Sequence, residues 1–355
     1  MKNLIYILFI LLNLQFLTAG DSASVIESLK RQTQVLEHHL DEIKKAADDV
    51  LWYQRVGDAA FIDKVFITGP PKANIKNPDA MGAKNPLKFW CYIFIPKRAD
   101  LDKKYPLIIL PHGGVHANFT TYYTHIVLEM LAQGYVVAAP EYRGSTGYGE
   151  GYYKNIDYGG MEVEDCDAAR EYLLDNYDFV DGSRVGVVGW SHGGLIALMS
   201  VFNHPSDYKA AFAGVPVSDL VMRMGYQEED YPDEFSADYH IGRTVFENLE
   251  EYKRRSPVWN VEKLRTPLLI HTNTNDDDVN WIEVQHLIQA LKAEGKKFEY
   301  EIFKDQPGGH SFDRIDIKNA RQIRLKIYKF LAEYLNPPNP FKTLKDIEKA
   351  AYIRK

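Results

Sequence analysis

From residue 88 onward, short apolar runs of strand length alternate with segments whose apolar residues recur at helical spacing. Some runs, such as PLIIL and VGVVG, contain no polar residue, which is typical of strands buried on both faces. Strands that alternate with helices favour a mostly parallel sheet covered by helices on both sides. We therefore predict an α/β protein with these strands: FWCYIFI, PLIILP, YVVAAPEY, RVGVVGW, KAAFAGVPV, PLLIHTNT and FEYEIF.

Five helices are predicted between these strands and after the last one. The pattern places them through Val127 to Leu131, over 161–175, after Ser191, over 281–294 and from about residue 315, with a shorter helical stretch near 246–255. In sheets of this kind, ligands bind beyond the carboxyl ends of the strands. The residues that follow each strand are therefore the first candidates for a functional site.

One of these strand ends carries the sequence VVGWSHGGLIALMS, in which Ser191 stands between Gly189 and Gly193. A serine on a sharp turn from strand to helix takes up strained backbone angles, and side chains two residues away on either side would clash. The pattern therefore indicates a nucleophile elbow that lifts the Ser191 hydroxyl out of the sheet. A glycine-rich strand end without chemistry has the same short pattern, so a base and an acid must follow it in the right order.

Both partners follow in the expected order. A serine hydroxyl needs a neighbouring base, which is usually a histidine oriented by a carboxylate. The sequence LLIHTNTNDDDV ends a predicted strand in three aspartates, and GGHSF places His310 between the last strand and the last helix. The order of serine, acid and histidine along the chain is the one that α/β-hydrolases use.

The same chemistry needs backbone amides that face the oxyanion formed when serine attacks a carbonyl. The first predicted donor is the amide of His192, directly after the nucleophile. The second is expected from the glycine-rich turn in IILPHGGVH, which contains His112, Gly113 and Gly114.

Taken together, several stretches resemble the catalytic domain of the prolyl oligopeptidase family of serine peptidases. They are PHGGVHA, PEYRGSTGYGEGYY, GWSHGG, RRSPVWNVEKLRTPLLIH, NDDDV and GGHSF, and the resemblance covers about residues 88 to 335. The resemblance implies an α/β-hydrolase fold with an eight-stranded sheet. It also implies that Ser191 is the nucleophile, His310 the base and Asp276 the acid, with Asp277 as the alternative acid.

The resemblance extends to residues around the nucleophile. Some members use a tyrosine hydroxyl in the oxyanion hole where this chain has His112, so we expect the amide of Gly114 to act there instead. His112 and Tyr142 are predicted to contact the substrate. Arg143, in YRGS, is expected to pair with a carboxylate near the site. Asp165 is expected to lie in the same region.

Peptidases of this family usually carry a β-propeller before the hydrolase domain, and here we expect none. We predict a signal peptide over 1–20, a helix and extension over 21–87, and a catalytic domain over 88–355. An acidic segment at 224–242 is predicted to be an insertion between KAAFAGVPV and PLLIHTNT, the sixth and seventh strands of the implied eight-stranded sheet. Its Glu228 and Glu229 either bind a substrate amino group or form a solvated loop, and its Tyr231 is a further substrate-binding candidate.

The N-terminal segment differs in composition from the rest. Lys2 precedes the apolar run LIYILFILLNLQFL and the small residues TAG, the pattern of a secretory signal cleaved near Ala19 or Gly20. We predict a secreted or periplasmic protein without stable membrane insertion after cleavage. Residues 24–55 then repeat apolar positions at helical spacing, which predicts an amphipathic helix that lies on the main body or pairs with the helix of a partner, as in a homo-oligomer.

Composition excludes several classes of function. The net charge of −7, without a strongly basic block, argues against nucleic acid as a partner. Cys91 and Cys166 are too few for a disulfide framework or a cysteine-rich zinc site, and both lie in apolar segments. The histidines lack carboxylates at ligand spacing, so we expect no metal and no cofactor.

Three functions remain open at this point. The first is a peptidase that cleaves short peptides. The second uses the same residues on esters, such as acetyl or feruloyl groups on polysaccharides. The third, a binding protein that kept the fold without catalysis, is disfavoured because the serine, the acid and the histidine are all present.

Overall fold

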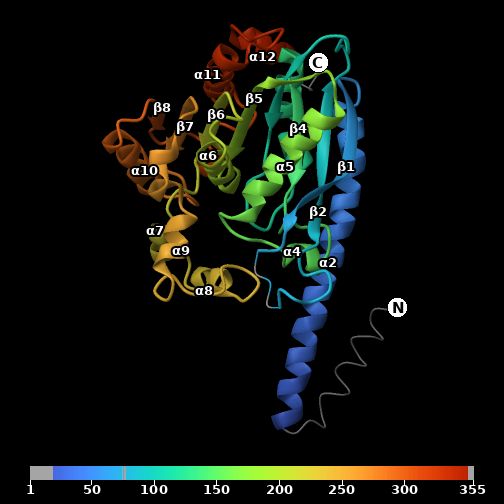
Figure 1. Ribbon diagram of the computed structural model, residues 1–355, viewed down its shortest axis with the longest axis vertical. Coiled ribbons are helices and arrows are strands. Elements are labelled where there is room, and N and C mark those ends of the chain that lie inside the picture. The colour runs from blue at the N-terminus through green and yellow to red at the C-terminus, as the bar shows by residue number, and fades with distance from the viewer. Residues whose placement is uncertain (1–18, 74, 76, 351–355) are drawn as a thin grey trace.

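The computed structural model describes residues 19–73, 75 and 77–350, and its centre is one eight-stranded sheet (Figure 1). The strand order is β1-β2-β4-β3-β5-β6-β7-β8. β1 pairs antiparallel with β2, β2 pairs antiparallel with β4, and all other pairs are parallel. This confirms the predicted α/β-hydrolase sheet. The strands are β1 (Ala60–Pro71), β2 (Pro86–Pro96), β3 (Tyr105–Ile109), β4 (Val136–Glu141), β5 (Val180–Trp190), β6 (Ala210–Gly214), β7 (Leu268–Asn273) and β8 (Glu299–Phe303).

Strand β1 comes from the segment that we expected to be an extension outside the catalytic domain. It pairs along β2 with Phe61 opposite Ile95 and Pro71 opposite Pro86. The proline-containing stretch over 68–87, which has no strand pattern in the sequence, therefore holds the end of β1 and the start of β2. Proline is tolerated here because β1 is an edge strand, where not every backbone N–H needs a partner in the ladder.

Helices cover both faces of the sheet, as predicted (Figure 1). On one face α5, α6 and α10 pack in a core with the β3 and β5 residues Leu107 and Val187. On the other face α3, α11, α12 and the end of α2 pack around Ile108 and Val188. The helices are α2 (Ala19–Val56), α3 (Thr124–Gln133), α4 (Glu150–Tyr153), α5 (Met161–Asn176), α6 (His192–Asn203), α7 (Leu220–Tyr226), α8 (Tyr231–Ser236), α9 (Leu249–Arg254), α10 (Trp281–Ala293), α11 (Lys318–Leu335) and α12 (Leu344–Ala350).

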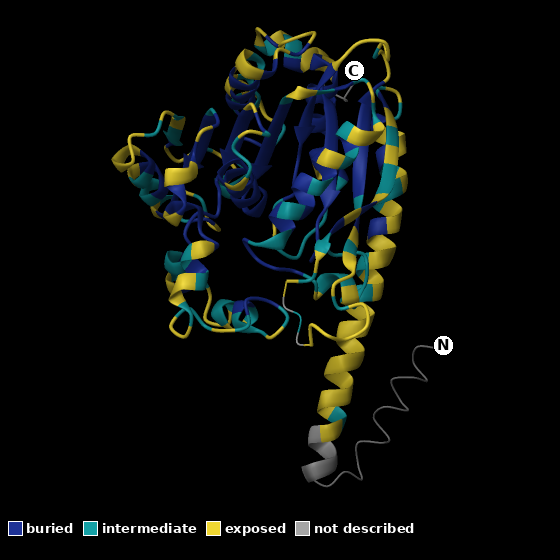
Figure 2. Cartoon of the chain, in the orientation of Figure 1, coloured by how far each residue is buried: buried dark blue, intermediate teal, exposed yellow. Residues whose placement is uncertain are grey.

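Helix α2 is attached to the main body by its C-terminal half. Trp52 is fully buried and stacks on Phe119, and the ammonium of Lys45 lies 2.5 Å from the buried carboxylate of Glu141. Apolar residues of the helix such as Leu36 and Ile43 are exposed. The N-terminal half of the helix is largely exposed in Figure 2. The prediction of a long helix is confirmed. Of the two arrangements predicted for it, packing of the apolar stripe on the main body is wrong, because aromatic and charged residues make that contact. Pairing with the helix of a partner stays a prediction.

The predicted insertion lies between β6 and β7 and contains α7, α8 and α9. Residues 1–18, which hold most of the predicted signal peptide, lie outside the described part of the chain. Among the residues that are described, no helix combines the length and the apolar character needed to cross a membrane.

Candidate active site

Ser191 occupies the turn between the end of β5 and the start of α6, and its side chain is almost fully buried. Its φ of 59° and ψ of −124° lie in the left-handed half of backbone space, which non-glycine residues adopt rarely. A Cβ on Gly189 would lie 2.0 Å from the carbonyl oxygen of Gly193, so only glycine fits there. The strand-to-helix turn predicted from the sequence is therefore present with its strained serine.

The glycine-rich turn after β3 lies directly against this elbow. A Cβ on Gly113 would be 3.3 Å from the Cβ of Ser191, and a Cβ on Gly193 would be 2.5 Å from the carbonyl oxygen of Pro111. Over the described range of the chain, the amides of Gly114 and His192 donate no hydrogen bond. Both amides therefore remain available to a ligand beside the serine.

His310 lies in a short 3₁₀ turn (Gly309–Ser311) after β8, and its imidazole contacts Asp276. Its Nδ1 is 2.9 Å from each carboxylate oxygen of Asp276, whose side chain is fully buried. One of these oxygens also accepts hydrogen bonds of 2.9 Å from the amides of Asp278 and Val279. The carboxylate is thus fixed by the backbone, and it holds the imidazole with Nδ1 as donor and Nε2 as acceptor.

Asp277, the alternative acid, does not contact the imidazole. It is exposed, and its Oδ1 lies 3.4 Å from the main-chain amide of His310. The geometry therefore favours Asp276 over Asp277.

The three residues are brought together by the order of the strands. Ser191 follows β5, Asp276 follows β7 and His310 follows β8, and β5 to β8 are parallel neighbours. Their carboxyl ends therefore meet at one edge of the sheet. A hydrogen bond of 2.8 Å from the indole of Trp190 to the carboxylate of Asp313 ties the elbow to the segment that carries His310.

Comparison with known proteins places this arrangement in a family. Residues 121–338, more than half of the chain, match the prolyl oligopeptidase family. The chain belongs to this family.

Family relatives among curated proteins are much longer than this chain. The acylamino-acid-releasing enzyme of Mus musculus is 29% identical over 65% of this chain and 31% of its own length. The uncharacterized peptidase YuxL of Bacillus subtilis (strain 168) is 29% identical over 66% of this chain and 35% of its own length. The chain therefore spans about a third of the length of these relatives.

Solved structures show the same fold. An acylaminoacyl peptidase in complex with Z-Gly-Gly-Phe-chloromethyl ketone aligns with a TM-score of 0.62 and 20% identity, over 81% of this chain and 44% of that one. Dipeptidyl peptidase 4 of Porphyromonas gingivalis aligns with a TM-score of 0.61 and 24% identity, over 81% of this chain and 38% of that one.

Two residues that were predicted to contact the substrate instead support the glycine-rich turn after β3. His112 and Tyr142 are both fully buried. The Tyr142 hydroxyl is 3.0 Å from the carbonyl oxygens of His112 and Gly114, and His112 Nε2 is 2.8 Å from Ser145 Oγ. Burial lowers the pKa of His112 to about 3, so the imidazole is neutral. The prediction of direct substrate contact was wrong for both, because their side chains point into the core below the turn.

The insertion reaches the site through Arg223, which the sequence did not single out. Its guanidinium donates to the Tyr231 hydroxyl at 2.7 Å and to the Asp278 carboxylate at 2.7 Å. Tyr231 is thus linked through Arg223 to the loop that carries Asp276 and Asp278. Glu228 and Glu229 are exposed on the turn before α8. Arg223 and Asp278 are 55 residues apart, so no local pattern could have paired them.

The predicted pairing of Arg143 is confirmed. Its guanidinium makes two hydrogen bonds, of 2.7 and 2.8 Å, with the buried carboxylate of Asp165. It also donates to the carbonyl oxygens of Pro70 and Pro71, at 2.9 and 3.1 Å. The pair therefore joins the loop after β4 to α5 and to the end of β1, which is a structural role.

One group of side chains within the described ranges has the spacing of metal ligands: Asp167, His204 and Asp207. Arg170 lies among them, 2.7 Å from Asp167 and 3.2 Å from Asp207. A guanidinium already neutralises these carboxylates, so the group does not fit a cation. It is built on α5 and the end of α6, away from the carboxyl ends of the strands.

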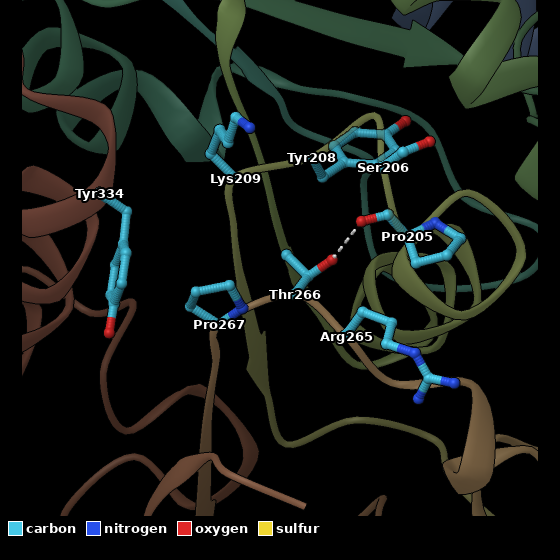
Figure 3. A pocket seen from close by; sticks show the side chains of 8 residues that line it. All are labelled: Pro205, Ser206, Tyr208, Lys209, Arg265, Thr266, Pro267 and Tyr334. Carbon is cyan, nitrogen blue, oxygen red and sulfur yellow. Dashed lines mark hydrogen bonds between the residues drawn. The ribbon is translucent and has the colours of Figure 1, made fainter.

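The pocket in Figure 3 has a volume of about 410 Å³ and lies at the opposite edge of the sheet. Lys209 and Pro267 line it, and they directly precede β6 and β7. It therefore opens at the amino ends of these strands, whereas Ser191, Asp276 and His310 follow carboxyl ends.

Proposed function

We propose that this protein is a serine peptidase that cleaves short peptides through an acyl-enzyme, with Ser191 as nucleophile, His310 as base and Asp276 as the residue that orients the base. The observation that carries the proposal is the bond from His310 Nδ1 to the buried Asp276, at the strand edge where Ser191 stands on its strained turn. Membership in the prolyl oligopeptidase family supports the same reading.

In the acylation step, Ser191 Oγ attacks the carbonyl carbon of the scissile amide while His310 Nε2 takes the hydroxyl proton. The carbonyl oxygen becomes an oxyanion, and the amides of His192 and Gly114 are the proposed donors to it. The C–N bond then breaks, and His310 gives its proton to the leaving amine. Water completes the cycle by the same route, with His310 as base, and releases the acid product.

Asp276 accelerates the reaction without itself changing protonation. By accepting from Nδ1 it keeps the lone pair on Nε2, where the serine proton must go, and it stabilises the imidazolium that forms. The two backbone amides that bind its Oδ1 keep the carboxylate in place.

The substrate class is supported by the names of the relatives. They include acylamino-acid-releasing enzymes and a dipeptidyl peptidase. In this chain Asp278 lies 3.7 Å from His310 Nε2, and Arg223 links it to Tyr231. These three residues are proposed to contact the residues next to the scissile bond. Glu228 and Glu229 are proposed to attract the amino group of a free N-terminus.

A panel of aminoacyl and dipeptidyl p-nitroanilides, each with a free and a blocked amino group, tests this function. The proposal expects anilide cleavage by the wild-type protein and none by Ser191→Ala. Cleavage of p-nitrophenyl esters without any anilide cleavage would contradict a peptidase and favour the esterase. In a Glu228→Gln/Glu229→Gln variant, the turnover of substrates with a free amino group should fall relative to that of blocked substrates. An unchanged ratio would show that these two residues do not recognise the amino group.

A further inference from the structure

Helix α2 carries a stripe, apolar at every position but Thr33, that the described part of the chain leaves uncovered. The stripe, here called the seam, consists of Ile26, Leu29, Thr33, Leu36, Leu40, Ile43, Ala47 and Val50. All eight residues are exposed, and Leu36, Ile43 and Val50 keep 66%, 67% and 68% of their surface open to solvent. This is an unusual amount of apolar surface to leave in water on one helix.

The seam follows a heptad repeat. Its members are separated alternately by three and four residues, so Ile26, Thr33, Leu40 and Ala47 take the a positions, and Leu29, Leu36, Ile43 and Val50 take the d positions. An apolar repeat sustained in this way is the pattern of a two-stranded coiled coil. From Ile26 to Val50 it extends about 37 Å along the helix.

The face of α2 that contacts the main body is the opposite one. His38, Lys45 and Trp52 are spaced by seven residues at the f positions, farthest from the seam. His38 packs against Tyr153, Lys45 pairs with Glu141, and Trp52 is buried. Attachment of the helix to its own body therefore leaves the whole seam free for a second helix.

The N-terminal half of α2 extends away from the main body (Figures 1 and 2). Of its described side chains from Ser24 to Glu37, all but Val25 are exposed. Most helices in proteins owe their stability to packing of an apolar face rather than to helix propensity alone. A partner on the seam would supply that packing.

We propose that the seam binds the seam of a second copy of this chain in an antiparallel coiled coil. If Leu36 faces Leu40 of the second copy, the register also sets Leu29 against Ala47, Thr33 against Ile43 and Ile26 against Val50. Each small or polar a residue then meets a large d residue, which fills the interface evenly. A parallel pair would instead stack Thr33 on Thr33 and Ala47 on Ala47, leaving a polar layer and a gap.

Charge and shape agree with the antiparallel arrangement. Glu37 and Lys44 both flank the seam at e positions, and e positions face each other in antiparallel pairs. Glu37 of each copy would lie near Lys44 of the other. Because each body is attached on the side away from the seam and only to the C-terminal half of α2, the two bodies would lie at opposite ends of the coiled coil.

Sedimentation equilibrium of the full chain tests the partner. The proposal expects a species of twice the monomer mass at micromolar concentration, and loss of this species in Leu36→Glu and Ile43→Glu. The matched control is Val35→Glu, which makes the same kind of change, apolar to acidic, at an exposed position of α2 outside the seam. This variant should remain dimeric. Far-UV circular dichroism and anilide turnover, retained in all variants, show that the main body is folded.

Disulfide cross-linking tests the orientation. Cys91 and Cys166 are buried and do not interfere. When Ile26→Cys and Val50→Cys proteins are mixed and oxidised, the antiparallel register predicts disulfides between the two variants. Disulfides only within each variant would overturn the antiparallel register.

Two outcomes would overturn the proposal as a whole. One is a wild-type protein that is monomeric throughout the micromolar range. If that monomer also floats with phosphatidylglycerol vesicles in a flotation assay, the seam binds a membrane surface instead of a second copy. The other is a dimer that persists unchanged in Leu36→Glu and Ile43→Glu, which would place the interface elsewhere. Neither outcome would bear on the proposed peptidase, because no seam residue belongs to its site.

Discussion

The Asp278 carboxylate lies between His310 and Arg223, with one oxygen 3.7 Å from Nε2 of the imidazole and the other 2.7 Å from the guanidinium. Burial alone would raise the pKa of Asp278, but Arg223 lowers it below its ordinary value, so the side chain is charged at neutral pH. A fixed negative charge thus stands on the side of His310 where the serine proton must arrive.

The assignment of the acid predicts a large difference between two neighbouring aspartates. Asp276→Asn should lower kcat by about 10⁴, because an amide in this place favours the wrong tautomer of His310. Asp277→Asn should lower kcat by less than about tenfold, since the Asp277 carboxylate accepts a hydrogen bond from a backbone amide and does not contact the imidazole. Single-turnover rates on one anilide substrate would measure both. A larger loss in Asp277→Asn would reverse the assignment.

The stability of the fold should depend on pH through His271. This residue is buried between Phe212 and Phe303, and burial lowers its pKa to about 3. The unfolded chain binds a proton at His271 below about pH 6.5, whereas the folded chain does not until about pH 3, so stability is present above 6.5 and is lost as the pH falls through this window. At pH 5 the loss from this one group is about 2 kcal/mol.

Urea unfolding of His271→Phe at pH 7.5 and pH 5 measures this contribution. The variant should lose about 2 kcal/mol less than the wild type between the two pH values, because phenylalanine cannot be protonated. Other buried histidines, including His112, also lower the free energy of unfolding at pH 5, and they do so equally in both proteins. Equal losses in the two proteins would show that His271 is not protonated on unfolding in this range.

The attachment of α2 predicts a strong dependence on one buried ion pair. Lys45 and Glu141 are both buried, and burial raises the pKa of Glu141 even with the ammonium 2.5 Å away. Lys45→Met leaves that carboxyl without its partner and should lower the free energy of unfolding by about 3–5 kcal/mol. Lys45→Met/Glu141→Gln should recover part of the loss. A single variant within about 1 kcal/mol of the wild type would mean that the pair does not hold the helix.

Much of the candidate site could be predicted because its signals are local. Gly189 and Gly193 mark the turn around Ser191, and the ends of two later strands mark Asp276 and His310. The alternation of strands and helices then places all three at one edge of the sheet. These predictions needed only the order of elements along the chain.

The direction of individual side chains could not be predicted in the same way. His112 and Tyr142 stand in stretches that lie beside the elbow, but their side chains turn into the core, which depends on packing between distant segments. The apolar period of α2 was plain in the sequence. Which face would meet the body was not, because Asp48, Trp52 and their neighbours contact Thr121 and Phe119, far along the chain.

The central claim, that Ser191 is an activated nucleophile, is tested most directly by covalent labelling. A fluorophosphonate probe reacts with serines that a neighbouring base activates, and peptide mapping by mass spectrometry locates the adduct. We predict one adduct, on the peptide that contains Ser191, and no labelling of Ser191→Ala with its circular dichroism spectrum unchanged. An adduct on another residue, or labelling that persists in Ser191→Ala, would contradict the assignment.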